Sequence, residues 1–119
     1  MNVQDVVTQI LAALQDELGA GFTQVRTFAQ AQSERLARLA ITIGEERMHG
    51  VLKTNNQMFE RFLRRLEEET RAFARQLAVL TILTLEKAWN AVVGVVWGAL
   101  NALIAQTGLP VALPQPPGE

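Results

Sequence analysis

The clearest structural signal in the chain is residues 52–80, LKTNNQMFERFLRRLEEETRAFARQLAVL, in which large apolar side chains recur every seven residues. A seven-residue repeat keeps these side chains on one face of a helix that winds against a second helix. Glutamates and arginines fill the opposite face, which we interpret as solvent-exposed. The stripe that we expect to form an oligomer seam contains Leu52, Phe59, Phe62, Leu66, Phe73, Leu77 and Leu80.

The residues before this stretch carry a second helical pattern, with apolar side chains three or four residues apart. Helix breaks are predicted near 19–21, where two glycines weaken a helix by roughly 1 kcal/mol each, and within 44–56, where capping signals recur. The sequence therefore predicts an all-α protein. Its charged, amphipathic body covers 1–76, as one long helix or as a helical hairpin with a coiled-coil-like seam.

The C-terminal part of the chain is apolar, and after residue 76 only Glu86, Lys87 and the last residue are charged. We predict an apolar helical arm over 77–106 and an extended, proline-rich tail over 107–119, because prolines remove amide donors and oppose helix. Within the arm, residues 88–105 would form about 27 Å of helix. This length is close to the ~30 Å hydrocarbon thickness of a bilayer, so 88–105 is a possible membrane span.

Small residues recur on one face of this arm. Gly94 and Gly98 form a GxxxG motif, Ala102 continues the series, and Asn90 precedes it by one turn. Such a ridge lets two helix backbones approach closely. We therefore predict a helix–helix ridge made of Asn90, Gly94, Gly98 and Ala102, and the alternative is ordinary packing inside a core.

The sequence also predicts how the arm would sit in a membrane. Trp89 lies near the start of the possible span, so it is predicted to lie at the membrane interface, where indoles settle. Asn90 and Asn101 are costly in lipid unless they hydrogen-bond to a neighbouring segment. Arginines precede the arm and none follows it, which places the body on the cytoplasmic or interior side.

Residues for catalysis or metal binding are few. The chain has no cysteine and one histidine, and 11 Lys+Arg against 12 Asp+Glu give a net charge of −1. This balance argues against a nucleic-acid binder. Glu45, Glu46 and His49 have the carboxylate–histidine spacing of di-iron helical bundles, but such bundles need this motif twice and the chain has it once. Ser33 has no histidine close to it in the sequence, so a catalytic triad is not indicated. We predict no catalytic, metal or cofactor residues and no small-molecule substrate.

A single amphipathic helix cannot bury its own apolar stripe, so we expect self-association. We expect a non-enzymatic, structural helical protein whose C-terminal arm contacts a membrane, as in a small virion or membrane-complex component. The alternative is a soluble oligomeric assembly element, such as a ring, tube or tail-type component, with the arm buried between subunits. A third hypothesis, a coat on a lipid surface, would normally require a more basic polar face.

Overall fold

The computed structural model describes residues 2–105 and 111–114 of the 119 residues. Within these residues all regular structure is helical, which confirms the predicted all-α fold. The elements are α1 (Val3–Leu18), the 3-10 turn η1 (Gly19–Gly21), α2 (Phe22–His49), the 3-10 turn η2 (Val51–Lys53), α3 (Asn56–Leu80) and α4 (Leu85–Ile104).

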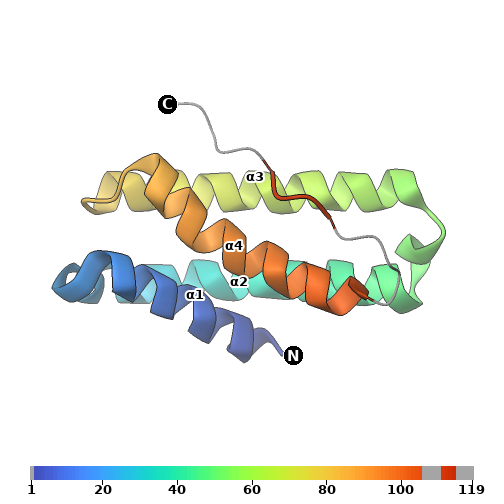
Figure 1. Ribbon diagram of the computed structural model, residues 1–119, viewed down its shortest axis with the longest axis horizontal. Helices are drawn as coiled ribbons and strands as arrows, with labels where there is room; N and C mark the ends of the chain where they lie inside the picture. Colours follow the sequence, from blue (N-terminus) through green and yellow to red (C-terminus); the bar gives the residue numbers. More distant parts are fainter. Residues whose placement is uncertain (1, 106–110, 115–119) are drawn as a thin grey trace.

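The four α-helices form a bundle in which α2 and α4 each contact all three of the other helices. Figure 1 shows α1 folding back on α2, α3 running alongside α2, and α4 crossing between α1 and α3. Helix α4 contacts each of the other three helices, and the bundle measures 44 × 29 × 20 Å. The charged body is therefore a folded set of three helices rather than one rod, because its apolar stripes bury one another and α4.

The connection between α1 and α2 follows from local chemistry at both ends of α1. Asn2 and Asp5 form a capping box, in which each side chain accepts the other residue's backbone N–H. Helix α1 ends at Gly19, whose φ of 57° lies in the left-handed region that favours glycine. The chain then reverses through η1 into α2.

The connection between α2 and α3 is held by Arg47. Its guanidinium donates to the Leu52 carbonyl at 2.7 Å and to Asn56 Oδ1 at 2.9 Å. It also lies 4.2 Å from the centroid of the Phe59 ring, a cation–π contact. Asn55 caps α3 by accepting the N–H of the third helical residue. One arginine thus fixes the turn that returns α3 along α2.

The apolar arm predicted over 77–106 is not a single helix, since α3 continues to Leu80 and α4 begins at Leu85. Two threonines separate them. The Thr81 hydroxyl donates to a carbonyl in the last turn of α3 and accepts the amide two residues later, and Thr84 caps α4. Threonine hydroxyls bind nearby backbone groups and so compete with a continuous helix. Hydropathy alone does not reveal this turn.

Helices α2 and α4 pack against each other in the core. A Cβ atom added at Gly44 of α2 would lie 2.8 Å from the Leu103 Cβ of α4, so the two helices are in close contact there. The buried small residues of α2 are Ala29, Ser33, Ala37, Ala40 and Gly44. The large buried side chains of α4 include Trp89, Val92, Val96, Trp97 and Leu100.

Of the predicted proline-rich tail over 107–119, the structure describes residues 111–114. They have no regular secondary structure and run back across the bundle in the direction opposite to α4 (Figure 1). The rest of the predicted tail lies outside the described residues.

Candidate interaction surface

The predicted oligomer seam packs within the chain. Leu52, Phe59, Leu66, Phe73 and Leu77 are buried, Phe62 is half-buried and Leu80 is exposed. Helix α3 contacts α2 and α4, and the Phe73 ring lies 5.8 Å from the ring of Phe28 on α2. The seven-residue period indicates a partner helix but not the chain to which it belongs. Here the partner helices come from the same chain, and a seam between copies stays a prediction.

The predicted ridge faces outward. Asn90, Gly94, Gly98 and Ala102 are all exposed on α4, and a Cβ atom added at either glycine would have nothing within 4 Å. Packing among the described residues therefore does not require glycine at these two positions. Contact between this ridge and another helix stays a prediction.

Trp89 differs from its predicted position at a membrane interface. Its side chain is 1 % exposed and Trp97 is 2 % exposed, because α1, α2 and α3 surround this side of α4. The Arg71 guanidinium lies 5.9 Å from the centroid of the Trp89 ring. Among the described residues α4 is the one helix long and apolar enough to cross a membrane, and half of the span considered is buried inside the protein.

The most apolar exposed surface lies at the turn between α3 and α4. Val79 is 83 %, Leu80 53 % and Ile82 89 % exposed. We call these three residues the apolar end. Leu80 lines two hollows there, one of about 310 Å³ shared with Phe28 and Val79, and one of about 250 Å³ shared with Ile82 and the α1–α2 turn. The α1–α2 and α3–α4 turns therefore meet at one end of the bundle (Figure 1).

Charges of both signs surround the apolar end. Arg75 lines the larger hollow, and Glu86 and Lys87 lie in the first turn of α4. All three are exposed, and none forms an ion pair with another described residue. The apolar end thus combines protruding side chains, hollows and unpaired charges of opposite sign.

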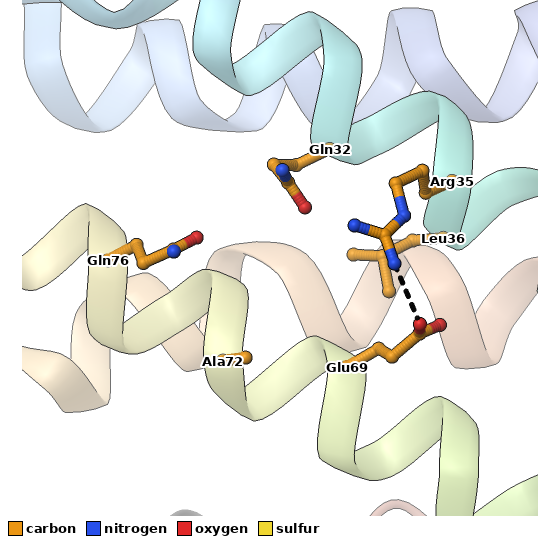
Figure 2. A pocket seen from close by; sticks show the side chains of 6 residues that line it. All are labelled: Gln32, Arg35, Leu36, Glu69, Ala72 and Gln76. Carbon is orange, nitrogen blue, oxygen red and sulfur yellow. Dashed lines mark hydrogen bonds and ion pairs between the residues drawn. The ribbon is translucent and has the colours of Figure 1, made fainter.

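A separate hollow, between α2 and α3, is polar (Figure 2). Its volume is about 150 Å³, and Arg35 Nη2 lies 3.1 Å from Glu69 Oε1 across it. Ligand pockets usually exceed ~300 Å³, and an exposed pair of this kind contributes about 0–1 kcal/mol. We interpret the Arg35–Glu69 pair as a link between two helices and not as part of a ligand site. The hollow is lined by Gln32, Arg35, Leu36, Glu69, Ala72 and Gln76.

The few residues with potential chemistry lie apart. Ser33 is fully buried in the middle of α2, whereas His49 is the exposed last residue of that helix. Sixteen residues of helix separate them by about 24 Å, so they cannot hydrogen-bond to each other. Within residues 2–105 and 111–114, no group of three potential metal ligands comes together. The predictions that concern catalysis and metals stay predictions.

Ser33 gives a test of the core. Its hydroxyl has no hydrogen-bond partner although the residue is 0 % exposed. We expect Ser33→Ala to raise the free energy of unfolding by about 1 kcal/mol, because it removes a desolvated hydroxyl and adds a better helix former. Urea unfolding followed by circular dichroism measures this change. Thr70→Val is the control, since the buried Thr70 hydroxyl donates to Leu66 O at 2.8 Å; equal destabilisation by both variants would contradict the expectation.

Asn101 binds the described part of the tail. Its Nδ2 donates to the Val111 carbonyl at 3.0 Å, and the Val111 N–H donates to Asn101 Oδ1 at 2.7 Å. We call this pair of bonds the Asn101 clamp. The sequence predicts that Asn101 hydrogen-bonds to a neighbouring segment, but no pattern identifies that segment as the tail. No pattern in the sequence predicts the apolar end either, because hydropathy does not reveal the turn at Thr81–Thr84.

Comparisons with protein-family models, with characterised proteins and with solved structures found no match.

Proposed function

We propose that this chain is a non-enzymatic structural protein, a helical assembly element that associates with copies of itself through the apolar end. The observation that carries the proposal is the exposure of Val79, Leu80 and Ile82 in a chain that buries both tryptophans and half of the apolar span of α4. Contiguous exposed apolar side chains mark interaction sites in small proteins. Burial of such side chains is worth about 25 cal/mol per Å².

The shape and charge of the apolar end favour a protein partner over a lipid surface. A flat bilayer has no protrusion to fill the two hollows beside Leu80, whereas a second copy carries the same protruding side chains. Segments that bind lipid surfaces usually carry an excess of basic residues. Here Arg75 and Lys87 are accompanied by Glu86, so each copy offers a carboxylate that can pair with a cation of the copy it faces.

Contact with a membrane through α4 is the other function that the sequence predicts. The length and composition of α4 favour it. To span a membrane, α4 would have to separate from α1, α2 and α3. The side chains now buried around Trp89 and Trp97 would then become exposed. We therefore place self-association first and treat membrane insertion as the competing outcome of the test below.

The test compares Ile82→Glu with Val51→Glu. Ile82 and Val51 are both well exposed, at 89 % and 65 %, but Val51 lies in η2, at the other end of α3 from the apolar end. By sedimentation equilibrium, we expect the unchanged chain to form oligomers. Ile82→Glu should weaken association at least about tenfold, since it places an unpaired charge in an apolar contact. Val51→Glu should leave the mass unchanged.

Two results would contradict the proposal. One is a monomeric chain at all concentrations up to about 1 mM, and the other is equal loss of association in both variants. Flotation of the chain with liposomes in high salt, without oligomers in plain buffer, would favour membrane contact instead.

A further inference from the structure

The outer face of α3 carries more unpaired positive charge than its sequence indicates. The helix contains five arginines and four glutamates. Two of these glutamates already have partners, since Glu67 pairs with Arg71 and Glu69 pairs with Arg35 of α2. Positive charge therefore prevails among the exposed side chains of α3 that form no ion pair with another described residue. They are Arg61, Arg64, Arg65, Arg75, Glu60 and Glu68.

Helix α1 carries the opposite charge. It contains Asp5, Asp16 and Glu17, and neither lysine nor arginine. All three carboxylates are exposed, and none forms an ion pair with another residue that the structure describes. Helix α4 crosses between α1 and α3, so α1 and the outer face of α3 lie on different sides of the bundle (Figure 1). The two helices of one copy therefore cannot neutralise each other, whereas those of two copies can.

The charges of the two helices have the same spacing. Asp5 and Asp16 are eleven residues apart on α1, and Arg64 and Arg75 are eleven residues apart on α3. Eleven residues make about three helical turns, so each pair lies on one face with roughly 16 Å between its Cα atoms. A helix α1 placed alongside α3 can therefore bring both carboxylates to both guanidinium groups at once.

The fold and the intervening residues favour one direction for this contact. Helices α1 and α3 both end near the apolar end, because the α1–α2 and α3–α4 turns meet there. A sideways displacement of one copy, with a rotation that aligns the two axes, sets α1 parallel to α3 of its neighbour. Gln9 then lies level with Glu68, each one turn beyond the first charge of its pair, and its amide can donate to the carboxylate. In the opposite direction Glu68 is level with Ala12, which has no donor.

We propose that the outer face of α3 binds α1 of a second copy in this parallel direction. In this contact Arg64 pairs with Asp5. Arg75 pairs with Asp16 in the same way. Asp5 Oδ2 also accepts the Asn2 N–H, but a carboxylate accepts several hydrogen bonds and so keeps capacity for Arg64. We call this the charge contact.

The charge contact deepens the proposed function and rests on it, because exposed ion pairs are individually weak and act here on copies that the apolar end brings together. Charge complementarity contributes mainly to the orientation and the rate of association. The contact joins two different surfaces, so it can repeat from copy to copy. Together with the apolar end, it gives each copy enough neighbours to build assemblies larger than a dimer.

The test exchanges the charges of one pair. Asp16→Arg places two arginines opposite each other, and Arg75→Asp places two carboxylates opposite each other. Sedimentation velocity at about 0.01 M salt, where the screening length is ~30 Å, should show at least about tenfold weaker association for either variant. A chain that carries both substitutions regains a pair of opposite charges, and its association should return to within about threefold of the unchanged chain.

A second variant avoids the apolar end, since Arg75 also lines a hollow there. Arg64 lies four turns before Leu80, and Arg64→Glu should weaken association at low salt as well. The matched control is Arg38→Glu, because Arg38 is an exposed arginine of α2 that forms no ion pair with another described residue. This control should leave the size distribution unchanged.

Two results would overturn the charge contact. One is a doubly substituted chain that associates as weakly as Asp16→Arg alone, and the other is equal association of Arg64→Glu and Arg38→Glu. The proposed function is tested separately by Ile82→Glu at about 1 M salt, where a screening length of ~3 Å suppresses exposed charges. Unchanged association of Ile82→Glu at that salt concentration would contradict the apolar end and not the charge contact.

Discussion

Trp97→Ala is expected to lower the free energy of unfolding by about 3–5 kcal/mol, the range found when a large buried aromatic side chain is truncated. Trp97 is 2 % exposed, in the middle of the helix that contacts α1, α2 and α3. The variant therefore leaves a cavity in the core. Domains of this size are stable by about 5–15 kcal/mol, so the loss is a large part of the total.

Guanidinium unfolding followed by circular dichroism measures the effect, at protein concentrations low enough to keep the chain monomeric. Trp97→Phe retains part of the apolar volume and should lose less, which keeps the test valid if Trp97→Ala fails to fold. Val51→Ala is the surface control and should change stability by less than about 0.5 kcal/mol. Similar stability of Trp97→Ala and Val51→Ala would show that α4 is not the core of the bundle in solution.

The helical class of the chain follows from its periodicity, and so does the buried side of α3, whereas the ridge predicted as the contact side of α4 is exposed. Phe59, Leu66 and Phe73 recur every seven residues on α3, and all three are buried. The pattern does not identify the helix that packs on this stripe. A buried stripe has the same spacing whether a helix of the same chain or of another copy packs on it. The spacing of the apolar residues on α3 therefore does not predict that α1, α2 and α3 of one chain all pack on α4.

The placement of α4 shows a second limit. A run of apolar residues about 18 long fits a bilayer and also fits the centre of a bundle, since both exclude water. Part of the deciding information lies in α2, where Gly44 leaves room for Leu103 of α4. Complementarity of this kind depends on two segments that are distant in the sequence, so neither segment reveals it alone.

Surface features were harder to predict for a local reason. Thr81 and Thr84 end one helix and begin another through their hydroxyl groups. This turn exposes Ile82, which hydropathy assigns to the interior of an arm. The Asn101 clamp likewise depends on the return of the tail over α4, and no periodicity encodes that return.

The glycines of α2 and α4 should respond in opposite ways to the same substitution. At Gly44 a new Cβ would lie 2.8 Å from both Cβ and Cδ1 of Leu103. Overpacking of a core costs about 1–3 kcal/mol, which exceeds the ~1 kcal/mol that alanine gains over glycine in a helix. We expect Gly44→Ala to destabilise the chain by about 1–2 kcal/mol. Gly98→Ala meets open space and should stabilise it by about 1 kcal/mol.

Thermal and urea unfolding of the two variants measure these signs. Adding Leu103→Ala to Gly44→Ala should relieve the contact with Cδ1 but not the contact with Cβ, which alanine keeps. Destabilisation by Gly98→Ala in the monomer would mean that the outer face of α4 is covered within the chain. The same variant also tests the ridge of Asn90, Gly94, Gly98 and Ala102. If another helix packs closely on this ridge, a methyl group at residue 98 weakens association while it stabilises the monomer. A variant that is more stable and associates as strongly as the unchanged chain would place self-association elsewhere on the bundle.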